Sequence, residues 1–277
     1  MVVAEHNKTN SFMRTPLRVL QITDTHLFGD EDGRLAGMDT DASSLEVIER
    51  VLADFLPADL ILATGDIAHE GYELAYARFK QRFERLKVPT LVIPGNHDEP
   101  TLLHRAMQGG LVQSRDHFVL GNWAFIMLDS TMPKQSGGHL DVAELELLER
   151  LLQAYPDHHT MICLHHHPVS MRSEWIDSIG VANSDDFFAI TDRFPQVRSI
   201  VWGHVHQAFS AVRKGVQLYA SPSTCVQFKP KQRNFALDDL PPGFRWFDLY
   251  PNGDIATEVV RMPVRSREVD LETRGYG

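Results

Sequence analysis

Short runs of apolar and β-branched residues recur along the chain, separated by longer segments with helical periodicity. Runs of this length are typical of buried β-strands. They lie at residues 18–23, 60–64, 90–94, 123–129, 160–164 and 199–203. The clearest helix is predicted at residues 141–155, where Asp141 is followed three residues later by Glu144 in a capping pattern. Alternating strands and helices predict an α/β fold.

The last third of the chain shows strand-like runs joined by turns rather than by helices. VQLYAS, FRWFDLY and IATEVVRM have this pattern, and the turn-forming residues 251–254 separate the last two. We therefore expect a second sheet. No repeat or linker divides the chain, so we predict one domain at residues 17–262, between a flexible tail at 1–16 and a polar tail at 263–277.

The composition is that of a globular protein, with 43% hydrophobic and 23% charged residues in 277. A net charge of −10 argues against a nucleic-acid partner, because clustered Lys and Arg are needed to neutralise phosphates. Cys163 and Cys225 make no disulfide framework and are expected to be buried thiols. No apolar stretch reaches the roughly 18 residues of a membrane helix. We expect a cytoplasmic protein without a membrane partner.

All but one of the strands predicted in the first three quarters of the chain lead directly into residues that can bind metals. These clusters are Asp24-Thr25-His26, Gly65-Asp66, Gly95-Asn96-His97-Asp98, His165-His166-His167 and Gly203-His204-Val205-His206. Any one of them could be an ordinary turn or a histidine-rich loop. Ligands of open α/β sheets bind beyond the carboxyl ends of the strands, where all five clusters would converge. The repetition of such clusters at successive strand ends predicts a metal-binding site.

The donor types favour two transition-metal ions. Imidazole and carboxylate suit Zn, Mn and Fe, whereas oxygen donors alone would suggest Mg or Ca. Alternate residues of an extended chain share a face, so D-x-H and H-x-H would each present two donors to one side. Water held between two ions about 3.5–4 Å apart loses a proton near neutral pH and becomes a nucleophile. Such a site needs no protein nucleophile.

The motifs, in this order, resemble those of the calcineurin-like metallophosphoesterase superfamily. The segments QITDTHLF, ATGDIA, PGNHD, LHHHP, GHVHQ, SPSTCVQFKP and NFALDDLPPGFRW are similar to those of bacterial class III cyclic nucleotide phosphodiesterases, over roughly residues 17–260. The resemblance implies a four-layer fold of two packed β-sheets flanked by helices. It also implies two divalent metal ions, Fe, Mn or Zn, and hydrolysis of 3′,5′-cyclic AMP to 5′-AMP by a metal-bridging hydroxide.

The resemblance also implies a ligand set. One ion would be bound by Asp24, His26, Asp66 and His206. The other would be bound by Asp66, Asn96, His204 and one histidine of the triplet. The family ligand lies in the pattern H-x-P, and Pro168 makes it His166. Alternation agrees with this choice, because it would turn His165 and His167 to the other side.

His97 is not a metal ligand in the family, and we expect it to donate a proton to the leaving 3′-oxygen. The alternative is that it only orients Asn96 or the backbone. The predicted substrate contacts are His26, Asp66, Asn96, His97 and His206. We expect His69 to be exposed to solvent, although it lies three residues after Asp66 and could reach the pocket. Phe228 could stack on adenine and Lys229 could meet phosphate, although core packing and a solvated charge are favoured for them.

Other functions compete with this one. A glycerophosphodiesterase or a broader phosphodiesterase of the same superfamily shares the metal motifs, because the rest of the pocket selects the alcohol. A nuclease is disfavoured by the acidic charge. A non-catalytic scaffold predicts lost ligands, whereas every expected position is filled here. The motifs of serine hydrolases and of P-loop NTPases are absent from the sequence.

Overall fold

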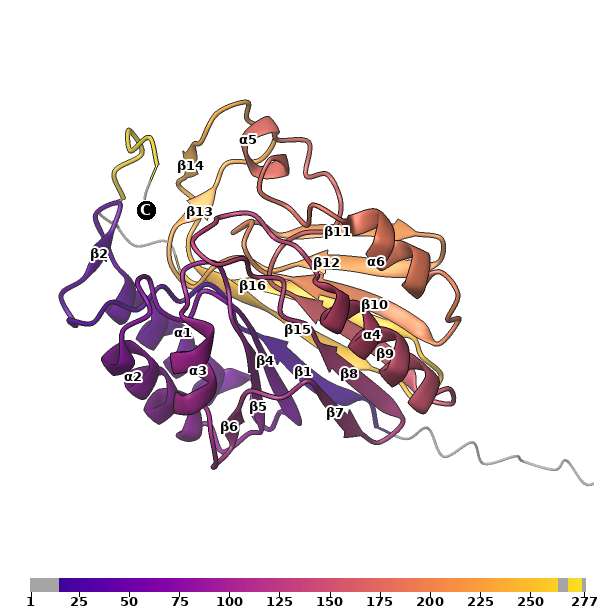
Figure 1. The fold of residues 1–277 in the computed structure, drawn as a ribbon. Helices are drawn as coiled ribbons and strands as arrows, with labels where there is room; N and C mark the ends of the chain where they lie inside the picture. The colour runs from indigo at the N-terminus through magenta and orange to yellow at the C-terminus, as the bar shows by residue number, and fades with distance from the viewer. Residues whose placement is uncertain (1–14, 264–268, 276–277) are drawn as a thin grey trace, which may run out of the picture.

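The structure is a computed structural model that describes residues 15–263 and 269–275. Two sheets of six strands lie face to face, and helices cover the outer side of each sheet (Figure 1). The predicted four-layer α/β fold, with two packed sheets flanked by helices, is confirmed.

The first sheet has the strand order β16-β15-β1-β4-β5-β6. Its mutually parallel strands are β1 (Leu17–Gln21), β4 (Leu60–Thr64), β5 (Thr90–Ile93) and β6 (Val112–Gln113). Two antiparallel strands extend it beside β1, namely β15 (Gly243–Leu249) and β16 (Ile255–Arg261). Its outer face carries α1 (Thr40–Asp54), α2 (Glu73–Glu84) and α3 (Pro100–Ala106).

The second sheet has the strand order β11-β12-β10-β9-β8-β7. Its parallel strands are β8 (Trp123–Met127), β9 (His159–Leu164), β10 (Val197–Trp202) and β12 (Val216–Ala220). The antiparallel edges are β7 (His117–Leu120) and β11 (Phe209–Arg213). Its outer face carries α4 (Val142–Ala154) and α6 (Ser184–Thr191).

Three small elements lie at one end of the sheets, at the top of Figure 1. They are the short helix α5 (Glu174–Asp177) and the paired strands β13 (Gln227–Phe228) and β14 (Leu237–Asp238). A further hairpin joins β2 (Arg34–Leu35) and β3 (Met38–Asp39).

A second sheet is present, as expected, but the strands of the last third are divided between the two sheets. β12 lies parallel to β10 in the second sheet, whereas β15 pairs antiparallel with β1 in the first. The chain therefore returns to the edge of its opening strand. That pairing covers the edge of β1, which would otherwise expose unpaired backbone groups.

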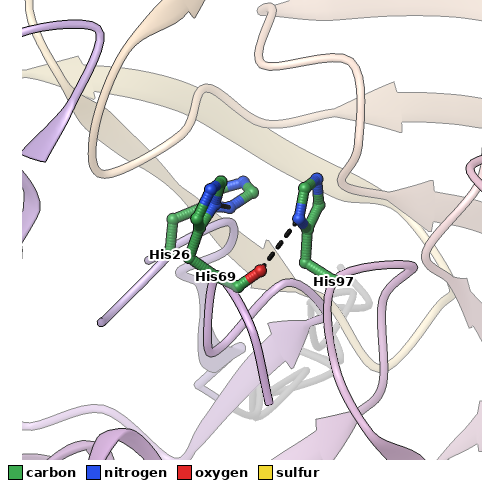
Figure 2. A group of neighbouring side chains, drawn as sticks. All are labelled: His26, His69 and His97. Carbon is green, nitrogen blue, oxygen red and sulfur yellow. Dashed lines mark hydrogen bonds between the residues drawn. The ribbon is translucent and has the colours of Figure 1, made fainter. Parts of the chain in front are cut away.

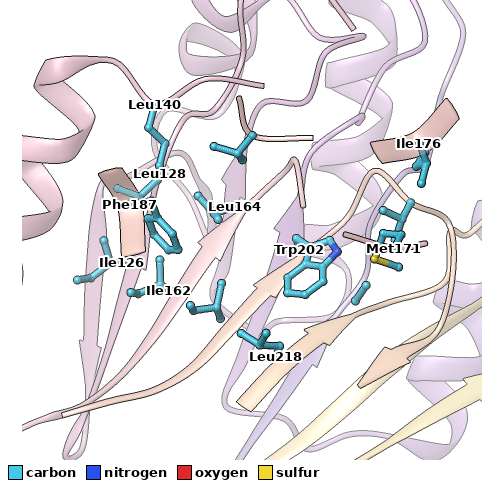
Figure 3. Packing of buried hydrophobic residues seen from close by; sticks show 14 of the residues in the cluster. Ile126, Leu128, Leu140, Ile162, Leu164, Met171, Ile176, Phe187, Trp202 and Leu218 are labelled. Atoms are coloured by element: carbon cyan, nitrogen blue, oxygen red, sulfur yellow. The ribbon is translucent and has the colours of Figure 1, made fainter. Parts of the chain in front are cut away.

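Alternate residues of the central strands face two different cores. In β9, Ile162 and Leu164 pack under the helices of the second sheet, whereas Met161 and Cys163 pack between the sheets. Figure 3 shows part of the first of these cores, with Trp202 and Phe187 among its largest side chains. Strands that are covered on both faces read as continuous apolar runs, which explains the sequence pattern.

Asp141 caps α4 as predicted, because its Oδ1 accepts the backbone N–H of Glu144 at 2.9 Å. The Glu144 carboxylate bonds elsewhere. Its Oε2 accepts the N–H of Asp129 at 3.0 Å, which ties α4 to the loop that follows β8.

The division into one domain and two tails stays a prediction. Residues 1–14, most of the predicted first tail, lie outside the described residues. In the second tail, the backbone N–H of Asp270 donates to the carbonyl of Ala36 at 2.8 Å. Within residues 15–263 and 269–275, no helix is both long and apolar enough to cross a membrane.

Candidate active site

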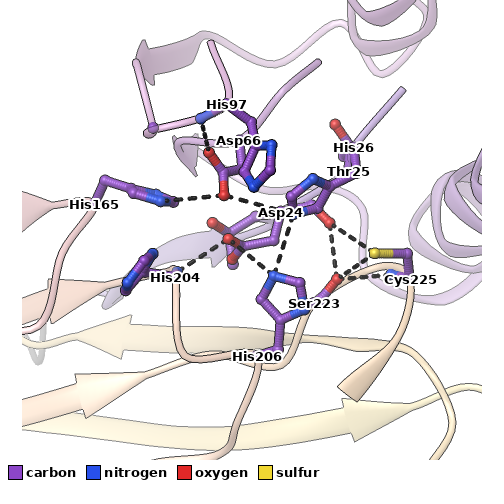
Figure 4. Close-up of polar contacts among 12 residues, drawn as sticks. Asp24, Thr25, His26, Asp66, His97, His165, His204, His206, Ser223 and Cys225 are labelled. Carbon is purple, nitrogen blue, oxygen red and sulfur yellow. Dashed lines mark hydrogen bonds and ion pairs between the residues drawn. The ribbon is translucent and has the colours of Figure 1, made fainter. Parts of the chain in front are cut away.

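The polar clusters of the sequence converge at one edge of the two sheets. β1, β4, β5, β9 and β10 each end just before one of them, and the side chains meet across the gap between the sheets (Figure 4). The glycines of these motifs permit the close approach. A Cβ on Gly95 would lie 2.2 Å from Asp66 Oδ1, and one on Gly65 would lie 2.2 Å from His165 Nδ1.

Five of the candidate donors sit on left-handed backbone. Their φ angles are 55° at Asp24, 44° at His26, 50° at Asp66, 63° at His204 and 46° at His206. L-residues rarely adopt this conformation, although Asp and His tolerate it better than most. Alternation along an extended strand therefore does not bring these donors together. Tight turns after the strands do, and such strained backbone is common at functional sites.

The first predicted donor set is assembled in the structure. One ligand atom each from Asp24, His26, Asp66 and His206 lie within 4.8 Å of one another. His206 Nε2 is 3.4 Å from Asp24 Oδ1 and 3.2 Å from His26 Nε2. The Nδ1–H of His206 donates to the carbonyl of Val226 at 2.8 Å, so its Nε2 lone pair faces the other donors.

The second donor set shares Asp66 with the first. Asp66 Oδ2 is 3.5 Å from His26 Nε2 on one side and 3.3 Å from His165 Nε2 on the other. His165 Nε2 is also 3.2 Å from Asn96 Oδ1. Atoms of the second cluster, His165, His166 and His204, lie within 4.8 Å of one another. Asp66 Oδ2 thus lies between His26 of the first cluster and His165 of the second.

The expectation that His165 faces away from the site is wrong. β9 ends at Leu164, and the chain bends at the triplet, so alternation does not apply there. The Nδ1–H of His165 donates to the carbonyl of Thr64 at 2.8 Å, which aims Nε2 at Asp66. His166 also belongs to the second cluster, but its Nδ1 is 2.8 Å from Ser130 Oγ. His166 as the ligand stays a prediction.

Several buried atoms at the centre have no hydrogen-bond partner among the described residues. They are Asp24 Oδ2, His166 Nε2 and His204 Nε2. Buried polar atoms are almost always paired, because desolvation without a partner is costly. Unpaired lone pairs of carboxylate and imidazole within these two donor clusters fit divalent cations.

Two of the imidazoles, those of His26 and His204, are held in the neutral form that binds metals. Burial lowers the pKa of His26 and His204 well below the ordinary value. His165 differs, because burial lowers its pKa but the carboxylate of Asp66 outweighs this and raises it to about 9. Conversely, burial would raise the pKa of Asp66, and the His165 imidazole holds it well below its usual range. A cation bound between His165 and Asp66 would take the place of the proton on His165 Nε2.

Two supporting residues were missed or misplaced by the sequence interpretation. His69 is buried rather than exposed, and its Nδ1 is 3.3 Å from His26 Nδ1. Its carbonyl accepts the Nδ1–H of His97 at 3.0 Å, and the two rings stack 4.8 Å apart (Figure 2). Asp98 accepts the backbone N–H groups of three residues, Ile67, Ala68 and Gly95. His69 has no partner of suitable spacing in the sequence. Asp98 belongs to the Gly95–Asp98 cluster, but its bonds to Ile67 and Ala68 are revealed only by the fold.

The segment SPSTC fixes the backbone of Asp24. The hydroxyl of Ser223 donates to the Asp24 carbonyl at 2.8 Å and accepts the N–H of Cys225 at the same distance. Cys163 and Cys225 are free and buried, as predicted.

A family model, the calcineurin-like phosphoesterase model, matches residues 17–208. The chain belongs to this family. Among relatives of the phosphoesterase, the 3′,5′-cyclic adenosine monophosphate phosphodiesterase CpdA of Pseudomonas aeruginosa is 40% identical over 99% of this chain and all of its own length. The CpdA protein of Escherichia coli strain K12 is 36% identical, over 94% of this chain and 95% of its own.

Solved structures show the same phosphoesterase fold at low identity. A dimetal phosphatase from Danio rerio is 15% identical and has a TM-score of 0.65, over 89% of this chain and 96% of its own. GAP50, the anchor in the inner membrane complex of Plasmodium, is 15% identical and has a TM-score of 0.62, over 90% of this chain and 85% of its own. The fold therefore occurs in proteins of different function, and the function of this one must be argued from its site.

Proposed function

We propose that the protein is a metal-dependent phosphodiesterase that hydrolyses 3′,5′-cyclic AMP to 5′-AMP. The observation that carries the proposal is the pair of donor clusters that share Asp66. Relatives named as cyclic AMP phosphodiesterases match over nearly the whole chain, and this supports the choice of substrate. The filled donor positions argue against a non-catalytic scaffold.

The two clusters would each hold one divalent cation. The first set is Asp24, His26, Asp66 and His206. The second set is Asp66, Asn96, His204 and an imidazole of the triplet, for which the sequence selects His166 and the contacts of Asp66 and Asn96 favour His165. Two such cations lower the pKa of a water held between them and polarise the phosphoryl oxygens.

We propose that His97 acts on the leaving group. It lines the same cavity as Asp66, Asn96 and His206, and its backbone N–H donates to Asp66 Oδ1 at 2.9 Å. Because its Nδ1–H is engaged by the carbonyl of His69, a proton passed to the ribose 3′-oxygen would have to be a second ring proton, carried on Nε2 of the imidazolium form. The His69 carbonyl thereby fixes the orientation of the ring and the nitrogen from which the proton would leave.

The decisive assay compares three diesters with the Mn²⁺-loaded protein: cyclic AMP, bis(p-nitrophenyl) phosphate and a glycerophosphodiester. We expect release of 5′-AMP, and loss of it in His206→Ala together with a lower content of bound metal. Hydrolysis of the other two diesters without cyclic AMP would contradict the proposed substrate. His97→Ala should keep its metal and lose about 10²- to 10⁴-fold in turnover, whereas an unchanged rate would remove His97 from the mechanism.

Measuring metal content, rather than activity, identifies which histidine of the triplet binds the second cation. His165→Ala and His166→Ala are each loaded with Mn²⁺ and the bound equivalents are counted. The variant that loses one equivalent identifies the ligand of the second cation, and the other serves as its matched control.

A cytoplasmic location also stays our prediction. It is supported by the buried free thiols of Cys163 and Cys225, which suit a reducing compartment.

A further inference from the structure

The cavity at the donor clusters has an aromatic end that the hydrolytic chemistry does not use. It measures about 220 Å³ and reaches from Asp66, His204 and His206 to the aromatic side chains of Trp175, Phe228 and Phe235. The three rings contact one another edge to face, with centroids 5.0 to 5.6 Å apart. The proposed hydrolysis assigns neither a metal ligand nor a proton donor to this end of the cavity.

The three rings differ in burial and in what they contact. Phe228 is buried, and its ring lies parallel to that of His206 with centroids 4.1 Å apart and 2° between the planes. It therefore supports a candidate metal donor. Trp175 and Phe235 are only partly buried and line the same cavity. Their surface is thus the part of the aromatic cluster that can meet a ligand.

Trp175 lies on α5 and Phe235 lies on the loop that joins β13 to β14, and two contacts connect these segments. The hydroxyl oxygen of Ser173 accepts the backbone N–H of Gln232 at 2.9 Å. Glu174 and Arg233 form an ion pair at 3.0 Å beside it. The two aromatic side chains are therefore held against each other before any ligand arrives, which lowers the entropy cost of binding.

We infer that Trp175 and Phe235 form the recess for the purine base of the cyclic nucleotide and so determine substrate specificity. The inference rests on the proposed function, because it takes the phosphodiester to lie at the donor clusters. A neutral, flat base suits an apolar aromatic wall, and stacking on one aromatic side chain is worth about a tenfold change in affinity. A diester without a base would lack this contact.

A second groove that shares Asn96 and His97 with the first cavity offers the competing position for the base. Its lining combines apolar side chains such as Met132 with the charged groups of Glu70 and Lys134, and the described residues that line it include no phenyl or indole ring. Charged and hydroxyl groups hold water, which stacking would have to displace without replacing their hydrogen bonds. The aromatic end is therefore the better site for the base.

The test compares cyclic AMP with methyl riboside 3′,5′-cyclic phosphate, which keeps the cyclic diester and replaces the base by methoxy. The variants are Trp175→Leu and Phe235→Leu, which keep apolar volume, and Lys134→Ala as the control from the second groove. We expect kcat/KM for cyclic AMP to fall about tenfold in the two aromatic variants, with no change for the methyl riboside. Lys134→Ala should change neither.

A second readout does not depend on turnover. 5′-AMP should quench tryptophan fluorescence of the Mn²⁺-loaded wild type and of Trp246→Phe, whereas Trp175→Phe should lose this response. Ribose 5-phosphate should quench none of them.

The outcomes separate the two proposals. Equal loss for both substrates, an unchanged rate for cyclic AMP, or a base-specific loss in Lys134→Ala would each overturn the aromatic recess. A wild-type protein that hydrolyses both substrates equally would also overturn it and leave the phosphodiesterase activity intact. Absence of hydrolysis of either cyclic substrate by the wild type would overturn the proposed function and the recess with it.

Discussion

Replacing Asp98 by Asn is expected to destabilise the protein although the side chain keeps its size. Oδ2 of Asp98 accepts the backbone N–H groups of Ile67 at 3.1 Å and Gly95 at 2.9 Å. Oδ1 accepts the N–H of Ala68 at 2.9 Å. An amide has one acceptor oxygen, so its NH₂ group must face at least one of these donors. Because Ala68 is fully buried, the displaced N–H finds no water.

The magnitude follows from the number of bonds. Burial and the nearby Asp66 carboxylate raise the pKa of Asp98 to about 7, so the comparison is made above that pH, where the group is charged. A hydrogen bond to a charged group is worth about 1.5–3 kcal/mol, and a buried donor left unpaired costs a similar amount. The favourable orientation of the amide loses one bond, so Asp98→Asn should lower the free energy of unfolding by about 2–3 kcal/mol. Asp98→Ala, which loses all three bonds, should lower it further.

Urea unfolding followed by circular dichroism in the presence of chelator measures this difference without a contribution from bound metal. The matched control is Asp141→Asn at the N-cap of α4, where Asn is as favourable as Asp. An Asp98→Asn variant that unfolds within about 0.5 kcal/mol of that control would refute the reasoning.

Three other predictions test different parts of the molecule. Burial raises the pKa of Glu144 from 4.5 to about 7, so the folded protein binds the proton of this carboxyl group more tightly than the unfolded chain does. The free energy of unfolding should therefore fall as the pH rises from about 5 to 8, and this fall should be smaller in Glu144→Gln when urea unfolding is measured across that range. Asp41 pairs with Arg78 and Arg82 and links α1 to α2, so Asp41→Ala should cost about 1–3 kcal/mol in urea unfolding, and an unchanged midpoint would argue against the link. Removing metal with EDTA should lower the midpoint of thermal unfolding. Adding Mn²⁺ at about 100 times its Kd should then raise the free energy of unfolding by about 2.7 kcal/mol. A thermal midpoint that does not change with Mn²⁺ would contradict metal binding at the donor clusters.

The sequence was sufficient to predict the elements and the place of the site. Continuous apolar runs marked the central strands, because both of their faces are covered, and the polar clusters followed the strand ends. It could not assign the closing strands to their sheets. β15 pairs with β1 across more than two hundred residues, and such a partnership depends on which edge the rest of the fold leaves open.

The finer geometry of the site depends on contacts that no local pattern contains. His165 was expected to face away because alternation assumes an extended chain, whereas the chain bends as soon as β9 ends. His69 has no partner nearby in sequence, yet its carbonyl orients His97. The base recess likewise needs Trp175 and Phe235 to meet from two distant segments.

The arrangement of strain and burial indicates that the fold forms the site before metal binds. Left-handed backbone costs about 1–2 kcal/mol per non-glycine residue, and five candidate donors adopt it. That cost is offset by the strands behind them, since β4 and β9 are packed between two apolar cores and cannot shift to relieve the turns. Metal should therefore add to the stability of an already folded domain rather than create it. The donors are then held in place for the phosphodiester whether or not substrate is present, which is the preorganisation that electrostatic catalysis requires.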